Sequence, residues 1–277
     1  MLSVNTNTGA MIALQYLNKT QGDLTATQTA ISTGMKVASA KDDGATYAIA
    51  QNMRSSVAGY SAVTDSLNRG MSAIDVAMSA GQSISDLLVQ MKQKALAAAD
   101  SSLDTASRKA MNQDFVALRD QITTIVKNAV FNGFNLVDGS THQIQSLASS
   151  DGVRKITVGA QNMSLSGSII TIHSSGATGC ISTLALASSM ITTIQTSLNN
   201  VNAALAKLSA GSKKFSIQLD FTQKLSDTLT SGIGHLVDAD LAQESALLTS
   251  LQTKQQLGVQ ALSIANQAPQ TVLQLFR

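Results

Sequence analysis

Aromatic side chains and charges are both scarce in this chain of 277 residues. Aromatic residues make up 3% of it, and tryptophan is absent. Charged residues make up 13%, about half of the roughly 25% that is usual in soluble domains. Ligand pockets are mostly lined by aromatic and other apolar side chains. The composition therefore argues against a thick globular core or an enzyme built around such a pocket.

Proline and cysteine are almost missing. The chain has one proline and one cysteine. Proline interrupts helices, so its scarcity suits long continuous ones. A single cysteine, Cys180, excludes an internal disulfide framework. Apolar residues still reach 44%, which argues against disorder along the whole chain.

The sequence shows no signal for nucleic acid, for a membrane or for standard export. The net charge is +2 and the basic residues are scattered, so nucleic-acid binding has little electrostatic support. No run of 18 apolar residues exists that could span a membrane. Residues 1–19 lack the basic and apolar segments of a secretory signal peptide. We therefore expect any export to use another route.

Apolar residues recur every three or four positions, which predicts helices close to a coiled-coil seam. One run predicts a single long helix from about residue 182 to at least 231, and others predict helices before residue 131. Seam positions in these runs are Leu67, Met71, Ile74, Met78, Leu88, Ile191, Ile194, Leu198, Val201, Leu205 and Leu208. The expected fold is mainly α, a long antiparallel coiled-coil rod.

Capping residues and turn signals predict where these helices break. Ser39–Asp42 resembles a capping box, and Asp42 and Asp43 suit a helix N-terminus. Residues Asp100–Asp104 are expected to break the helix, with a new N-terminal cap before Met111, and Asp238, Asp240 and Glu244 suit the start of the last helix. Turn signals at 132–133, 138–139 and 151–152 predict a small β-hairpin region, with strands at 153–158 and 169–172, at the tip of the rod.

Both ends of the chain are amphipathic but uncharged. No side chain from Met1 to Asn18, or from Gln255 to Phe276, carries a charge. A solvated helix normally carries charge on its outer face, so we expect both ends to be buried between protein surfaces. The expected contact positions are Leu14, Leu17, Leu24, Ile31, Leu241, Leu248, Leu251, Leu262, Pro269, Leu273 and Leu275. The pattern favours polymerisation, but an ordinary two-helix coiled coil inside one molecule stays open.

Three stretches resemble bacterial flagellins. They are SVNTN followed by LNKTQGDLTATQTAISTGMKVASAKDDGATYAIA, then FNGFNLVDG, and LSIANQAPQTVLQLFR at the C-terminus. The resemblance covers about residues 1–140 and 182–277. The short middle is similar to compact members without large outer domains, of the kind found in some alphaproteobacteria.

The resemblance implies a role for each segment. Residues 1–40 and 238–277 would form the inner tube of a filament. The contact positions expected at the two chain ends would then lie between subunits. Residues 41–131 and 182–237 would form the outer-tube coiled coil, and 132–181 a β-hairpin or variable tip. A spoke including Gly34, Asp42 and Asp43 would join the tubes. Some members are modified on exposed loops, so Ser164, Ser166 and Ser168 are candidates for glycosylation, beside the plain alternative of a solvated loop.

The resemblance also implies partners and a location. Many copies of this or related chains would polymerise outside the cell, after type III export as an unfolded chain. An export chaperone, a filament cap and hook–filament junction proteins would be partners, with no cofactor. Where family members sensed by an innate receptor carry an Arg-Glu-Leu-Ala type stretch, this chain has Lys94-Ala95-Leu96-Ala97, so weak recognition is expected.

Three other functions are alternatives to a filament subunit. A hook–filament junction protein has similar helical ends and is the main alternative. A membrane-inserting translocator would need an apolar span of about 20 residues, which is absent. An enzyme would need a site in the β segment, but no HExxH, Walker loop or GxSxG motif occurs and His142, His173 and His235 lack metal-ligand spacing.

Overall fold

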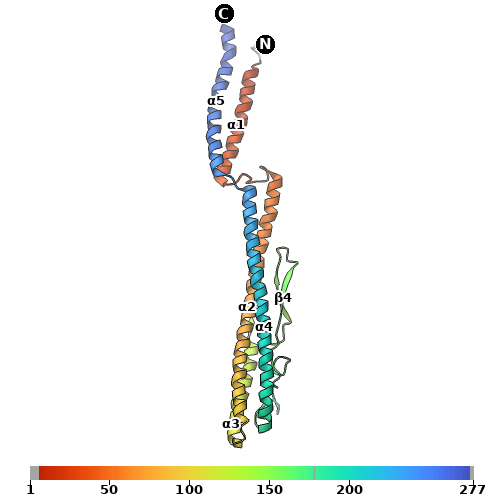
Figure 1. Cartoon of the computed structure of the whole chain (residues 1–277). Helices are drawn as coiled ribbons and strands as arrows, with labels where there is room; N and C mark the ends of the chain where they lie inside the picture. Colours follow the sequence, from red (N-terminus) through yellow and green to blue (C-terminus); the bar gives the residue numbers. More distant parts are fainter. Residues whose placement is uncertain (1–5, 177–178, 275–277) are drawn as a thin grey trace. The chain divides into compact units, whose positions relative to one another are not determined.

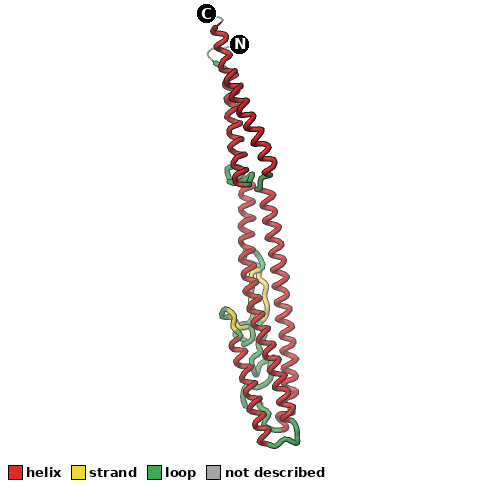
Figure 2. The backbone as a smooth tube through the Cα atoms, turned by 90° about the vertical axis from the view of Figure 1, so that its left-hand side faces the viewer, coloured by secondary structure: helices red, strands yellow, loops and turns green. Residues whose placement is uncertain are grey.

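The computed structural model describes the backbone of residues 6–176 and 179–274, with side chains through residue 267. Helices dominate this part of the chain (Figures 1 and 2). They are α1 Thr8–Thr33, α2 Gly44–Ala98, α3 Thr105–Asn128, α4 Leu184–Val237 and α5 Leu241–Gln274. The strands are β1 Val130–Phe131, β2 Phe134–Asn135, β3 Gln143–Leu147 and β4 Lys155–Gly159. The predicted mainly α fold with a small β region is confirmed.

The chain divides into two compact units, which we describe separately. The central unit is Ser56–Asp227, and the terminal unit combines Met1–Ser55 with Thr228–Arg277. The central unit holds α3, the strands and most of α2 and α4. The terminal unit holds α1 and α5 with the adjoining ends of α2 and α4.

An apolar seam between antiparallel helices α2 and α4 forms the centre of the central unit. The predicted seam residues Leu67, Ile74, Leu88, Ile194, Val201 and Leu208 are buried. Met71, Met78, Ile191, Leu198 and Leu205 are partly buried against the same core. Helix α3 adds Phe115 and Ile122, both fully buried. Each fully buried large side chain contributes about 1.5–3 kcal/mol, so this seam can hold the unit together without neighbours.

Asp104 fixes the break between α2 and α3, as expected from the sequence. Its carboxylate accepts hydrogen bonds from Ala106 N at 3.2 Å and Ser107 N at 3.4 Å. Upstream, the Asp100 carboxylate accepts from Ser102 N at 2.8 Å and closes the turn that follows α2. Hydrogen bonds from Ser107, first from its side chain, hold the pKa of Asp104 below its ordinary 3.8.

The strands differ in part from the sequence expectation. Asn132 and Gly133 have φ of 49° and 82° and turn β1 into β2, as a two-residue hairpin requires. Strand β4 overlaps the predicted strand at 153–158. It pairs antiparallel with β3, a strand that was not predicted from the sequence. The strand predicted at 169–172 is wrong. Ile170 makes only an isolated bridge to Leu165, and Ile170 and Ile172 are instead fully buried in the core.

The β3–β4 hairpin packs along the side of α2 and α4, not at their far end, where the sequence analysis places it. Ser146 Oγ donates to Ser66 O at 3.0 Å, and Leu147 N donates to Ser66 Oγ at 3.1 Å. On the other helix, Gln218 Nε2 donates to Ala148 O at 3.1 Å. Figure 1 shows β4 beside the middle of α4.

Glycines on both helices allow this close approach. A Cβ at Gly211 of α4 would lie 2.5 Å from Val158 Cγ1 of β4. A Cβ at Gly70 of α2 would lie 2.4 Å from Ser146 Oγ of β3 and from Phe215 Cε2 of α4. The hairpin therefore seats where each helix lacks a side chain.

We predict that Gly211→Ala destabilises the central unit by about 1–3 kcal/mol, because overpacking forces neighbouring atoms to move. Denaturant unfolding of the monomer measures this. The matched control is Gly159→Ala in β4, where a Cβ would meet nothing within 4 Å. Equal stability of Gly211→Ala and wild type would contradict the close packing of β4 on α4.

Acid should weaken the start of α3. Because the pKa of Asp104 is lower in the folded chain than in the unfolded chain, its carboxylate stabilises the fold above the unfolded pKa. This stabilisation is lost as the pH falls through the folded pKa. Asp104→Asn keeps a cap without the charge, so protection of the α3 amides against hydrogen exchange should depend less on pH between about 7 and 2 than in wild type. Ser107→Ala should lie between the two, and identical profiles for all three proteins would refute the assignment.

Candidate assembly interface

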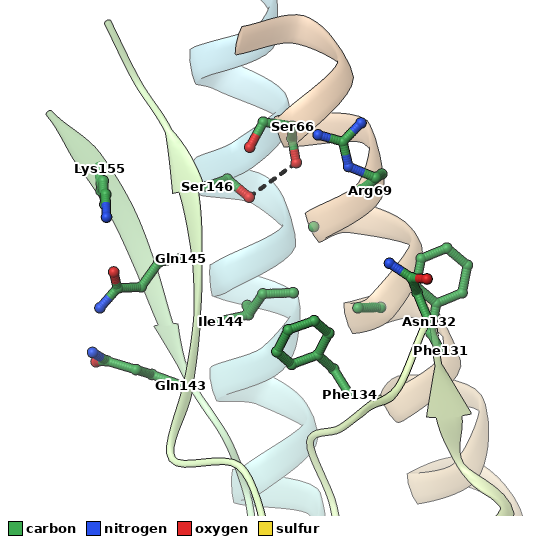
Figure 3. A pocket seen from close by; sticks show the side chains of 12 residues that line it. Ser66, Arg69, Phe131, Asn132, Phe134, Gln143, Ile144, Gln145, Ser146 and Lys155 are labelled. Carbon is green, nitrogen blue, oxygen red and sulfur yellow. Dashed lines mark hydrogen bonds between the residues drawn. The ribbon is translucent and has the colours of Figure 1, made fainter. Parts of the chain in front are cut away.

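A concavity beside α2 in the central unit is lined by polar and apolar side chains. It has a volume of about 430 Å³ and lies between α2, the β1–β2 turn and the β3–β4 hairpin (Figure 3). Phe134 and Ile144 point into it, and Arg69 and Lys155 stand at its edges. Its lining includes no carboxylate, histidine or cysteine. The cavity therefore offers contact area and positive charge.

Two further features are absent from the described residues. No group of three or more potential metal ligands gathers there. No described helix has the length and hydropathy to cross a membrane.

A short connection between α1 and α2 is tied to the end of α4 in the terminal unit. Gly34 ends α1 with φ of 71°, a left-handed conformation that favours glycine. Lys36 N donates to Val237 O at 2.8 Å, and Ala239 N donates to Gly34 O at 2.9 Å. Met35 and Asp238 form an antiparallel bridge across the same gap. Residues 34–37 and 237–239 thus pair like two short strands.

A small apolar cluster and two aspartates complete this connection. Val37, Ala50 and Val237 are buried together. The expected capping box is present in part, because the Asp42 carboxylate accepts from Ser39 N at 2.9 Å and Ser39 Oγ at 3.1 Å. Asp43 is the N-terminal cap of α2, accepting from Ala45 N at 3.0 Å and Thr46 Oγ1 at 2.6 Å. Hydrogen bonds from Ser39 and Thr46 hold the pKa of Asp42 and Asp43, respectively, below 3.8.

Helices α1 and α5 pack side by side along a narrow seam. Their less exposed positions recur every three or four residues, as in a coiled coil. On α1 these positions are Ala10, Ala13, Leu17, Thr20, Leu24, Thr27, Ala30 and Ile31. On α5 they are Glu244, Leu248, Leu251, Gln255, Gly258, Leu262 and Ala265. Small and polar residues fill much of this seam, so it buries less apolar area than the seam between α2 and α4.

Polar contacts set the alignment of this pair. Gln255 Nε2 donates to Gln21 Oε1 at 2.7 Å, and Asn7 Nδ2 donates to Ala265 O at 2.6 Å. Asn7 also caps α1 by accepting from Ala10 N at 3.0 Å. Asp240 caps α5, accepting from Ala242 N at 2.9 Å. Among the described residues, the polar contacts between α1 and α5 are thus made by uncharged amides and not by ion pairs.

Large apolar side chains stand exposed on the outer faces of α1 and α5. Of eighteen such side chains in the described residues, nine belong to these two helices. They are Met11, Ile12, Leu14, Tyr16, Leu241, Leu247, Leu257, Val259 and Ile264. They lie outside the seam on both helices, and so many exposed large apolar side chains make these helices the candidate site of protein association.

Of the contact positions expected from the sequence, those whose side chains are described fall into two groups. Leu17, Leu24, Ile31, Leu248, Leu251 and Leu262 face the seam between α1 and α5. Leu14 and Leu241 stand 47% and 50% exposed, away from it. The side chains of Pro269 and Leu273, and all of Leu275, lie outside the described residues. The helix extends through Gln274, so α5 does not end at Pro269.

Most of the nine exposed apolar side chains on α1 and α5 were not among the contact positions expected from the sequence. Met11, Ile12, Tyr16, Leu257 and Ile264 do not share the spacing of the seam and were therefore left out of the stripe. The available signal was their size: large apolar residues outside a complete seam on an uncharged helix need a second partner.

The three candidate modification sites differ in their surroundings. Ser164 Oγ donates to Asp138 O at 3.1 Å, and Ser166 Oγ accepts from Ser174 N at 3.2 Å. Ser168 is exposed, and within the described segments its hydroxyl has no hydrogen bond. Only Ser168 thus presents an exposed hydroxyl that is not already engaged.

Comparison with known proteins agrees with this arrangement. Residues 4–142 match the model of the bacterial flagellin N-terminal helical region, and residues 191–276 match that of the C-terminal helical region. Flagellin FljK of Caulobacter vibrioides is 54% identical over 275 residues, covering 99% of this chain and 98% of that protein. A flagellin of Brucella melitensis is 36% identical over 290 residues, covering both chains fully.

A solved structure shares the fold. The crystal structure of Bacillus cereus flagellin superposes with a TM-score of 0.50 at 22% identity, covering 57% of this chain and 88% of that one. The matches at both helical ends and along the full length place the long α2–α4 pair and the apolar terminal helices in a known context. The chain belongs to the bacterial flagellin family.

Proposed function

We propose that this chain, a structural subunit of the flagellar filament and not an enzyme, polymerises by burying the outer faces of α1 and α5 between copies. The nine exposed apolar side chains on these helices carry the proposal. At about 25 cal/mol per Å² of apolar area removed from water, burying such surfaces drives association strongly. The isolated chain has no means of covering them among its described residues.

The scarcity of charge on these helices supports the same proposal. The charged residues of α1 are Lys19 and Asp23, and those of α5 are Glu244 and Lys254. Lys19, Asp23 and Lys254 all line one groove of about 420 Å³ between the two helices, beside Leu17 and Leu257. Most of the length of both helices can therefore enter an interface without desolvating an ion.

The roles of the other segments follow from this arrangement. Helices α1 and α5 would form the inner tube of the filament, and α2, α3 and α4 the outer tube. The paired connection around Gly34 and Asp238 would be the spoke between them. A complete apolar seam lets the outer-tube helices fold before assembly, whereas the small and polar seam of α1 and α5 leaves the inner-tube helices dependent on neighbours.

The remaining partners extend the proposal. Related flagellins form the flagellar filament, which is extracellular, and we propose that this chain leaves the cell unfolded through the flagellum's type III apparatus. The lack of a disulfide framework suits that route. A cytoplasmic chaperone would hold the C-terminal region, and cap and hook–filament junction proteins would meet the two ends of the filament.

We predict that Ile264→Asp abolishes or strongly reduces polymerisation and leaves the monomer folded. Ile264 is 70% exposed, so a carboxylate there costs the monomer little. In a filament the same carboxylate would be buried without a partner, at several kcal/mol, which raises the critical concentration at least about 100-fold. Sedimentation after seeding with filament fragments measures this concentration.

The matched control is Val153→Asp. Val153 is 78% exposed and lies in the turn of the β3–β4 hairpin, which belongs to the central unit and not to α1 or α5. It should polymerise close to the wild-type concentration, with the same helix content in both monomers. Normal polymerisation of Ile264→Asp would exclude the outer face of α5 from the subunit interface.

A further inference from the structure

Along one stretch of the two long helices, the exposed charges are segregated by sign. Between Gly70 and Met91 the charged residues of α2 are Asp75 and Asp86. Between Leu184 and Leu219 the charged residues of α4 are Lys207, Lys213 and Lys214. All five are exposed, and none belongs to an ion pair among the described residues. One molecule thus carries unneutralised acidic and basic surfaces on neighbouring helices.

These acidic and basic surfaces lie at the same height in the central unit. Gly70 of α2 contacts Phe215 of α4, and Gly81 contacts Leu205. Asp75 lies between these two levels on α2, and Lys207 and Lys214 lie between them on α4. Both helices rise 1.5 Å per residue, so Asp75 stands roughly midway in height between the two lysines.

The charges nevertheless point away from the seam that joins the helices. On α2, Asp75 and Asp86 follow the spacing of the exposed Ser79 and Gln82, opposite the buried Leu67 and Ile74. This surface, the acidic stripe, also includes Asp65 further up the helix. Arg69 lies one turn from Asp65 and reduces its negative field, so Asp75 and Asp86 are the distinctive part.

On α4 the lysines flank exposed apolar side chains. Lys207, Ala210, Lys214, Ile217 and Phe221 recur at intervals of three and four and are all exposed, which defines the basic stripe. Ile217 is 62% exposed and Phe221 is 57% exposed. Asp220 beside them is neutralised by Lys224 at 2.9 Å. The stripe therefore combines net positive charge with apolar area that is unusual on a solvated helix.

We propose that the basic stripe on α4 of one subunit docks against the acidic stripe on α2 of a second copy standing beside it. This inference rests on the proposed function and names a lateral contact within it. Two different surfaces of one chain meet, so the contact is heterologous and can repeat from one subunit to the next around a filament. Because Asp75 stands midway in height between Lys207 and Lys214, the pairing needs little axial displacement between neighbours.

The charges select the partner and its orientation. Exposed ion pairs are individually weak, but opposite stripes steer association and disfavour contacts between like stripes. Ile217 and Phe221 supply the apolar area that is buried once the stripes meet. A second copy is favoured over another protein because the chain itself carries both complementary surfaces.

Charge reversal tests this docking. Asp75→Lys and Lys214→Glu are each expected to slow seeded filament growth about tenfold, because each places like charges opposite one another between subunits. The variant carrying both substitutions restores opposite charges in every contact and should grow within about twofold of wild type. Helix content and thermal unfolding of the monomers should be the same for all four proteins.

Lys109→Glu is the matched control, since Lys109 is exposed on α3 outside both stripes and the change in net charge is identical to that of Lys214→Glu. It should grow like wild type. Growth of the single variants at the wild-type rate, failure of the double variant to recover, or equal slowing by Lys109→Glu would each overturn the docking and leave the proposed function intact. Failure of wild type itself to elongate seeds would instead overturn the proposed function.

Discussion

Everything in this subunit depends on how apolar area is divided between the inside of one molecule and the surface it shares with others. Helices α2 and α4 bury a complete apolar seam within the chain. Helices α1 and α5 meet along a seam of small and polar residues and leave large apolar side chains outside it. A monomer can therefore be stable in one unit and incomplete in the other. Under the proposed function, α1 and α5 are completed only when neighbouring copies cover these side chains.

The sequence predicted the local features well because short-range physics decides them. Helix spacing and caps such as Asp43, Asp104 and Asp240 depend on residues within one or two turns, and the structure places them at the expected helix starts. The turn at Asn132–Gly133 is equally local, since its positive φ angles suit those two residues.

Long-range placement could not be predicted in the same way. The position of the β3–β4 hairpin depends on Gly70 and Gly211, whose missing side chains make room for strands distant in sequence. The side of α1 that faces α5 also depends on tertiary contacts, so the sequence did not separate Leu17, which faces α5, from Leu14, which stands outside that seam. Burial of Ile170 and Ile172 in a loop was mistaken for a strand because apolar runs of that length have no distinctive period.

Two kinds of surface serve two needs of a filament subunit. Apolar surface holds neighbours together, but it is non-directional and would accept many arrangements. Charges of opposite sign on α2 and α4 contribute less energy yet distinguish one lateral arrangement from another. The charge-poor helices α1 and α5 would thus supply the free energy of association. The charges on α2 and α4 would select the orientation of neighbouring subunits. A chain with so few charged residues gains most from each one when its position decides which neighbour it meets.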